Sequence, residues 1–143
     1  LALHDADTGD LGPVLAAAHD VSNGGLVQAL ADMAVRAGVG ASIDLTALCD
    51  EAGIDDFTAL FSESQARAVL AVSEGYLDLV LRAAEAEGVP AVRIGTTGGE
   101  LLTIQLAAGS DPGGPTGSSD EVLAFDVAEL AAVSDGVLRG LFD

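Results

Sequence analysis

Ala18-His19-Asp20-Val21-Ser22-Asn23-Gly24-Gly25-Leu26 is the stretch that decides the fold of this 143-residue chain. The apolar residues up to Ala18 predict the end of a buried strand, and the polar residues with two glycines predict a tight turn. The apolar spacing from Leu26 to Ala34 then predicts a helix over 25–37. This layout presents backbone N–H groups at a helix N-terminus, where anions bind readily.

Five residues of this turn are candidates for ligand binding. Asp20 stands at a strand end, where α/β sheets place ligand groups. Ser22 and Asn23 can cap the helix or bind a ligand oxygen, and Gly24 and Gly25 allow positive φ and a close approach of the backbone. The spacing matches neither a Walker A loop nor a dinucleotide fingerprint. An ordinary capped helix start that holds no ligand therefore remains the alternative.

A second polar motif, Phe61-Ser62-Glu63-Ser64-Gln65-Ala66-Arg67, leads into a predicted strand over 66–72. Glu63 and Gln65 are suited to ligand amide or hydroxyl groups, and Arg67 is suited to a phosphate or to Glu63. The alternative is a polar turn with a structural ion pair. If both motifs line one cleft, their side chains should lie within about a ligand's width of each other.

The remaining periodicity predicts strands that alternate with helices early in the chain and a hairpin late in it. A turn is expected over 55–62, and the other elements are strands over 40–45, 91–96, 101–106 and 122–125, helices over 46–52, 74–87 and 126–141, a hairpin turn at Gly98-Gly99 and a loop over 109–120. This order predicts an α+β fold, a three-layer α/β/α arrangement with helices packed on a mixed β-sheet. Residues 1–12 are expected to be a linker or tail remnant, and residues 13–143 one domain.

The charge balance limits the partners. The chain has 23 acidic residues against five basic ones, all arginine, and its formal net charge is −18. Nucleic acid and anionic membranes both require a basic surface, so neither is expected as a partner. The acids are spread along the chain, which favours either a protein adapted to high salt or an ordinary acidic subunit.

The remaining chemistry-bearing residues give no catalytic or metal pattern. Cys49 is the sole cysteine, which excludes an intrachain disulfide and favours a reducing cytoplasm. It lies in an apolar stretch and is expected in the core. His19 is interpreted as a core or interface residue, because neighbours in a strand point to opposite faces and Asp20 would face away. Two histidines and one cysteine at unrelated spacings predict no metal site, and no secretory signal or membrane-spanning run is visible.

Together, the motifs at 19–26 and 61–67 resemble the C-terminal domain of the aminoimidazole ribonucleotide synthetase superfamily. Within it they are most similar to the synthetase (large) subunits of phosphoribosylformylglycinamidine synthase. The segment Ala91-Val92-Arg93-Ile94-Gly95 and the closing helix from Phe125-Asp126 to Phe142 also fit. In that family a nucleotide-binding domain and this domain occur twice in one chain, and the present residues are similar to the second copy.

The resemblance implies a purine-biosynthesis ligase. It would convert formylglycinamide ribonucleotide to formylglycinamidine ribonucleotide with ATP and glutamine-derived ammonia. Glu63, Ser64 and Gln65 would contact the substrate, whereas ATP, Mg²⁺ and the catalytic groups would be held mainly by other domains. The partners implied are N-terminal ATP-binding domains of the same protein, a glutaminase subunit and a small accessory subunit, and the isolated fragment would be inactive. The alternatives are another enzyme of the superfamily, of the aminoimidazole ribonucleotide synthetase, hydrogenase maturation or selenophosphate synthetase type, and a non-catalytic binding or scaffold module.

Overall fold

The computed structural model describes residues 14–63, 66–106 and 122–142. The expectations for 1–12, 109–120, Ser64 and Gln65 therefore lie outside the described residues. The elements, in chain order, are β1 (Leu15–Asp20), α1 (Gly25–Ala37), β2 (Ala41–Asp44), α2 (Thr46–Ala52), α3 (Asp56–Phe61), β3 (Ala68–Val72), the 3₁₀ turn η2 (Glu74–Tyr76), α4 (Leu77–Ala86), β4 (Gly95–Thr97), β5 (Leu101–Gln105), β6 (Val122–Asp126) and α5 (Val127–Phe142).

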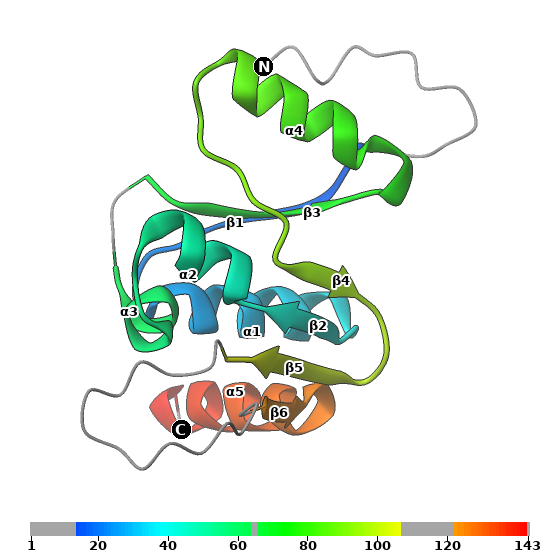
Figure 1. The fold of residues 1–143 in the computed structure, drawn as a ribbon. Coiled ribbons are helices and arrows are strands. Elements are labelled where there is room, and N and C mark those ends of the chain that lie inside the picture. The colour runs from blue at the N-terminus through cyan, green and yellow to red at the C-terminus, as the bar shows by residue number, and fades with distance from the viewer. Residues whose placement is uncertain (1–13, 64–65, 107–121, 143) are drawn as a thin grey trace.

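The described strands form two sheets. One has four strands in the order β4-β2-β5-β6, with β2 and β5 parallel and the other pairs antiparallel. The other is a two-stranded antiparallel ribbon of β1 and β3. Figure 1 shows α4 along the ribbon and α5 at the opposite end of the molecule, beside β6. The predicted mixed α/β fold, with helices packed on a mixed sheet, is confirmed.

The hairpin predicted around Gly98-Gly99 is wrong, because β2 lies between β4 and β5. The loop that contains Gly98 and Gly99 instead bonds to Gly40, just before β2. The N–H of Gly40 donates to the carbonyl of Gly99, and that of Gly98 donates to the carbonyl of Gly40, both over 2.8 Å. Two glycines between apolar strands indicate a tight turn, but they do not say whether a third strand enters between them.

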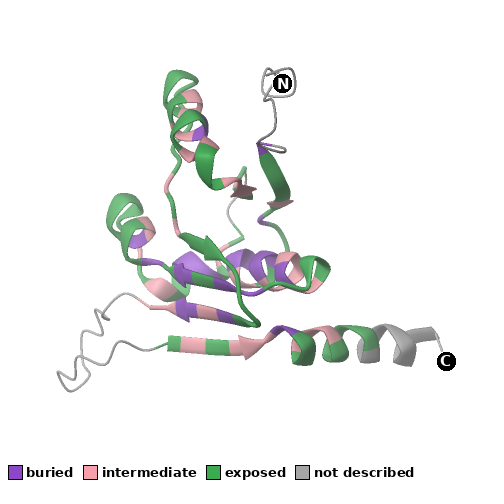
Figure 2. Ribbon diagram, turned by 90° about the vertical axis from the view of Figure 1, so that its right-hand side faces the viewer, coloured by how far each residue is buried: buried purple, intermediate pink, exposed green. Residues whose placement is uncertain are grey.

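The expectation that the strand before the motif turn is buried is also wrong. Leu15 to Ala18 are exposed, and His19 is intermediate (Figure 2). Within the described residues β1 pairs only with β3, so this ribbon has fewer neighbours than a central strand of the larger sheet. The short apolar run predicted a strand correctly, but such a run does not by itself establish burial.

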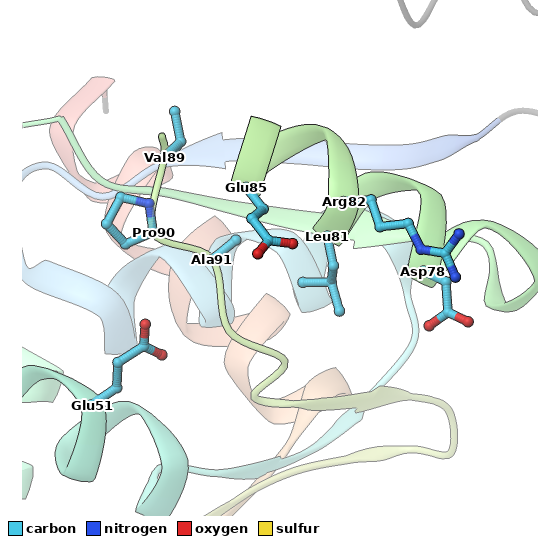
Figure 3. A pocket seen from close by; sticks show the side chains of 8 residues that line it. All are labelled: Glu51, Asp78, Leu81, Arg82, Glu85, Val89, Pro90 and Ala91. Carbon is cyan, nitrogen blue, oxygen red and sulfur yellow. The ribbon is translucent and has the colours of Figure 1, made fainter. Parts of the chain in front are cut away.

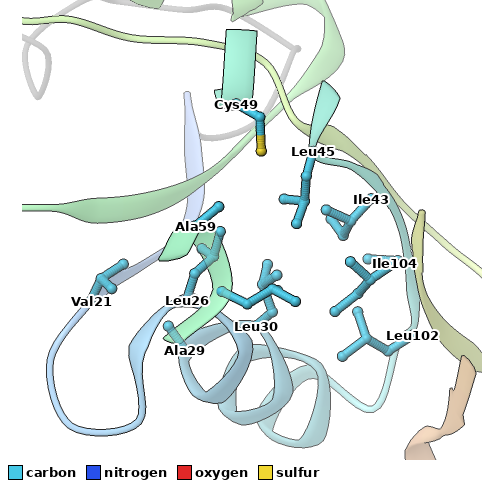
Figure 4. Close-up of a cluster of buried hydrophobic side chains, with 12 residues drawn as sticks. Val21, Leu26, Ala29, Leu30, Ile43, Leu45, Cys49, Ala59, Leu102 and Ile104 are labelled. Carbon is cyan, nitrogen blue, oxygen red and sulfur yellow. The ribbon is translucent and has the colours of Figure 1, made fainter. Parts of the chain in front are cut away.

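The core lies between α1 and the larger sheet (Figure 4). Leu26, Ala29 and Leu30 of α1 belong to the same buried cluster as Ile43 of β2 and Ile104 of β5. The spacing of three and four residues on α1 and the alternation on the strands turn these side chains inward. The Cys49 side chain from α2 and the Ala59 and Leu60 side chains from α3 complete the cluster above them. Packing against this core fixes α1, and with it the turn that precedes it.

Helix α3 replaces the turn expected over 55–62. Asp55 is its N-cap, and the Asp55 carboxylate accepts the N–H of Thr58 over 2.7 Å. Its buried residues, Ala59 and Leu60, face the core, and the helix contacts α1. This short helix therefore holds the segment that carries Glu63 against the start of α1.

Candidate functional site

The glycines of the motif turn adopt the conformations that the sequence predicted. Gly24 and Gly25 have φ of 82° and 71°, in the left-handed region that L side chains rarely occupy. A Cβ atom on Gly25 would lie 2.4 Å from the carbonyl oxygen of Leu60 in α3. Two glycines are therefore required for backbone geometry and for the close approach of α1 to α3.

The turn and the second motif are in direct contact. The N–H of Gly24 donates to Oε1 of Glu63 over 2.9 Å, and the N–H of Val21 donates to the carbonyl of Arg67 over the same distance. The first bond joins residues 39 positions apart in the chain. The structure thus brings the two motifs together at the N-terminus of α1.

The Glu63 carboxylate lies where an anion is favoured. Gly24 is the N-cap of α1, and the partial positive charge of the helix N-terminus attracts a carboxylate there. The anion at this helix N-terminus is therefore a side chain of the protein itself, Glu63. A ligand phosphate at the same N–H would have to displace it, whereas a ligand N–H or O–H can donate to the second carboxylate oxygen.

The exposed residues of the turn do not cap the helix through their side chains. Ser22, Asn23 and Asp20 are exposed, and α1 has no side-chain capping bond at Gly24. The carbonyl of Ser22 accepts the N–H of Gly25 over 3.1 Å instead. The two left-handed glycines turn the backbone so that a main-chain carbonyl occupies the place of a side-chain cap.

Arg67 is held by α3. Its Nη2 donates to the carbonyl of Ala59 over 3.4 Å, in a partly buried position. Carbonyls in the last turn of a helix lack intrahelical partners and attract cations. In this structure the Arg67 guanidinium bonds to the end of α3, and its expected role, with a phosphate or with Glu63, stays a prediction.

His19 lies between two carboxylates. Its Nδ1 is 2.6 Å from the backbone carbonyl of Asp20 and 3.8 Å from Oδ1 of the same residue. Its Nε2 is 3.6 Å from Oδ2 of Asp32, on α1. The sequence interpretation expected the Asp20 side chain to face away from His19 and is wrong on this point, because Oδ1 of Asp20 lies 3.8 Å from Nδ1. It did not identify the partner on the helix.

Cys49 is buried, as expected. Its side chain is in the core, and Sγ donates to Oδ1 of Asp56 over 3.4 Å. Burial, followed by the Asp56 contact, raises the pKa of Cys49 to about 11. The thiol is therefore protonated and weakly nucleophilic at neutral pH.

Two open depressions lie away from the motifs. One, of about 470 Å³, is lined by residues of α2, α4 and the segment after α4 (Figure 3). The other, of about 410 Å³, lies beside β4 and the start of α2. Among the predicted site residues that the structure describes, none lines either depression. Within the described residues no group of three or more His, Cys, Asp or Glu side chains could hold a metal ion, and none of the helices is long and apolar enough to cross a bilayer.

The sequence analysis did not predict two features around the turn. The first is α3, which the Asp55 cap and the apolar spacing of Phe57, Leu60 and Phe61 could have indicated. The second is the pair Gln28 and Asp32, whose spacing of four residues places both on one face of α1. Only the packing of β1 on α1 shows that this face meets His19.

Comparison with known proteins gives consistent matches. Residues 6–106 match the family described as AIR synthase related protein, C-terminal domain. The chain is 39% identical over 129 residues to the phosphoribosylformylglycinamidine synthase subunit PurL of Thermobifida fusca, and 46% identical over 94 residues to that of Rhodospirillum rubrum. These matches cover 90% and 66% of the chain but only 14% and 12% of the relatives.

Solved structures agree on the fold. T. maritima PurL complexed with ATP superposes with a TM-score of 0.63 at 18% identity, and the same protein complexed with FGAR superposes with 0.66 at 20% identity. Both cover 82% of this chain, which corresponds to 19% and 18% of those chains. The chain thus spans about one seventh of the first relative and under one fifth of the solved structures.

Proposed function

The chain belongs to the family of AIR synthase related protein C-terminal domains, and we propose that it is part of an ATP-dependent ligase of purine biosynthesis. The reaction is the conversion of formylglycinamide ribonucleotide to formylglycinamidine ribonucleotide with glutamine-derived ammonia. The similarity to phosphoribosylformylglycinamidine synthase subunits over 90% of the chain supports this choice over other enzymes of the superfamily.

The Glu63–Gly24 hydrogen bond is the observation that carries the proposal. It fixes one carboxylate oxygen of Glu63 and leaves the other to accept a hydrogen bond from a ligand. Formylglycinamide ribonucleotide carries amide N–H groups and ribose hydroxyls, which are suitable donors. A carboxylate at this helix end disfavours the ligand's phosphate there, so Glu63 is expected to contact the amide or ribose portion.

The surrounding groups extend this contact. Ser22 and Asn23 are exposed beside Gly24 and can bond to the same ligand, and Ser64 and Gln65 continue the chain from Glu63. Arg67 supports the segment through its bond to Ala59. The proposed substrate-binding set is therefore Asp20, Ser22, Asn23, Gly24, Gly25, Glu63, Ser64, Gln65 and Arg67.

The rest of the chemistry is assigned to other parts of a longer protein. ATP and Mg²⁺ are expected mainly on N-terminal nucleotide-binding domains, since this chain spans only 14% of the first relative. A glutaminase subunit would supply ammonia, and a small accessory subunit would complete the assembly in the cytoplasm. The isolated domain is expected to be inactive.

The test uses the full-length protein that contains this chain. Glu63→Gln should raise the KM for formylglycinamide ribonucleotide by roughly 10- to 100-fold, the equivalent of a lost hydrogen bond to a charged group. Glu87→Gln, at the end of α4, is the control for loss of one negative charge. An unchanged KM in Glu63→Gln would contradict substrate contact and favour a scaffold role for this domain.

A further inference from the structure

A series of contacts between neighbouring groups connects the two ends of the motif turn. It begins at the carbonyl of Asp20, passes through the His19 imidazole to the Asp32 carboxylate, and continues to the side chain of Gln28. Gln28 in turn lies against Gly24, whose N–H binds Glu63. The proposed substrate contact and His19 are therefore at two ends of one connected set of groups.

The contact between His19 and Asp20 requires a hydrogen on Nδ1 of the ring. A main-chain carbonyl can only accept, so at 2.6 Å the hydrogen must be on Nδ1. The His19 side chain has only 17% of its surface exposed, which limits the rotation of the ring. This bond restrains the orientation of the Asp20 carbonyl, where β1 ends and the turn begins.

The other side of the ring faces helix α1. Nε2 lies 3.6 Å from Oδ2 of Asp32, and Oδ1 of Asp32 accepts from Nε2 of Gln28 over 2.9 Å. A Cβ atom on Gly24 would stand 2.8 Å from Cβ of Gln28, so the Gln28 side chain occupies the space beside that glycine. The first two turns of α1 thus lie beside one edge of the ring and restrain the end of the motif turn.

We propose that His19 is a positioning residue for the substrate site, which sets the motif turn and, through it, the Gly24 N–H that orients Glu63. The inference rests on the proposed function for its kinetic consequence, although the restraint itself is a property of the fold. His19 makes no contact with the reacting atoms in this role. Its absence should weaken substrate binding without changing the chemical step.

Three substitutions separate the two sides of the ring. The amide nitrogen of Asn is as many bonds from Cα as Nδ1, so His19→Asn can still donate to the Asp20 carbonyl. The amide nitrogen of Gln matches Nε2, so His19→Gln can reach Asp32 but not the Asp20 carbonyl. His19→Ala removes both contacts. Because the Asp20 contact is the short one, His19→Asn should be the variant that retains function.

The experiment measures kinetics and hydrogen exchange in the full-length protein. His19→Ala and His19→Gln should raise the KM for formylglycinamide ribonucleotide about fivefold or more with kcat within about twofold, whereas His19→Asn should stay near the wild-type KM. Amide exchange in the peptide that spans residues 20–30 should be faster in His19→Ala and His19→Gln than in the wild type, and close to wild type in His19→Asn. Peptides from β5 should exchange as in the wild type, which shows that the fold is retained. Thr96→Ala, at an exposed position of β4, is the control for loss of a side chain away from the turn.

Two results would overturn the inference. One is a His19→Ala variant with wild-type KM and wild-type exchange at the turn. The other is equal impairment of His19→Ala, His19→Gln and His19→Asn together with faster exchange throughout the domain, which is the behaviour of a residue needed only for stability. If the wild-type protein does not turn over formylglycinamide ribonucleotide, the proposed function fails, while the order of exchange at the turn still tests the role of His19.

Discussion

Gly25 and Leu60 are so close that a Cβ atom on Gly25 would lie 2.4 Å from the carbonyl oxygen of Leu60. The two residues belong to α1 and α3, which pack against each other at the site. Both the position and the φ of 71° demand glycine. This contact sets how closely the segment bearing Glu63 approaches the start of α1.

Gly25→Ala should therefore be strongly destabilising. A side chain here meets backbone atoms, which cannot move aside cheaply, and it also strains the left-handed conformation. Gly38→Ala is the matched control, because Gly38 has φ of 64° but no atom within 4 Å of its Cβ position. Urea unfolding should show Gly25→Ala to be roughly 1–3 kcal/mol less stable than Gly38→Ala, the usual cost of overpacking. Equal losses in the two variants would contradict the close packing of α1 on α3.

The single thiol should be almost inert in the folded chain. Cys49 is buried, and burial raises its pKa to about 11, so little thiolate forms at pH 8. Because Cys49 is the only cysteine of the 143 residues, a thiol reagent reports on it alone. We expect the reaction to be slower in the native chain than in guanidinium by roughly a hundredfold or more, from the loss of thiolate and of access. Rapid native labelling would show that the Cys49 side chain is not packed in the core.

Two carboxylates at helix starts should stop stabilising the fold at acid pH. Asp55, the N-cap of α3, accepts the N–H of Thr58, and Asp44, just before α2, accepts that of Thr46; these hydrogen bonds lower the pKa of each carboxyl below its ordinary value of 3.8. Because the folded pKa is the lower one, each carboxylate stabilises the fold above pH 3.8 and loses this effect as the pH falls through the folded pKa. The stability difference between the wild type and Asp44→Ala/Asp55→Ala should thus be larger at pH 6 than near pH 2.

Urea unfolding at the two pH values tests this prediction. Glu87→Ala, at the exposed end of α4, controls for the loss of a negative charge from a strongly acidic chain. A difference between wild type and the double variant that stays constant with pH would mean that the carboxylates do not stabilise α2 and α3 through their charged form.

Salt should stabilise the fold. A net charge of −18 on 143 residues produces mutual repulsion that ions screen within a Debye length of about 3 Å at 1 M. We expect molar KCl to raise the melting temperature by roughly 3–6 °C, the equivalent of about 1 kcal/mol. An uncharged osmolyte at equal osmolality is the control for general exclusion effects. A melting temperature that does not respond to KCl would refute adaptation to high salt.

Local signals in the sequence predicted the elements that depend on neighbouring residues. The strand, turn and helix from Leu15 to Ala37 follow the apolar periodicity and the two glycines, and the structure confirms them. Gly38 and Gly53 end α1 and α2 in the left-handed conformation that a helix terminus requires. Asp126 caps α5 by accepting the N–H groups of Ala128 and Glu129 at the start of the helix predicted over 126–141.

Other features depended on contacts that periodicity does not encode. Six-residue α3 makes fewer than two helical turns, so the Asp55 cap and the spacing of its apolar residues do not by themselves distinguish it from the turn expected over 55–62. The order of β4, β2 and β5 depends on which strand enters between two others, and the exposure of β1 depends on the neighbours of its ribbon. Neither is a property of a single segment.

By itself, the sequence determined the strand–turn–helix of the motif, the need for glycine at positions 24 and 25, and the family to which the chain belongs. These depend on residues a few positions apart, within reach of the backbone's own hydrogen bonds. The tertiary structure alone decided that the Gly24 N–H binds Glu63, that Arg67 bonds to α3, and that His19 faces Asp32. The Glu63 and His19 contacts exist because α1 packs against α3 and β1, and the burial of its apolar face, not any local pattern, brings these distant residues close together.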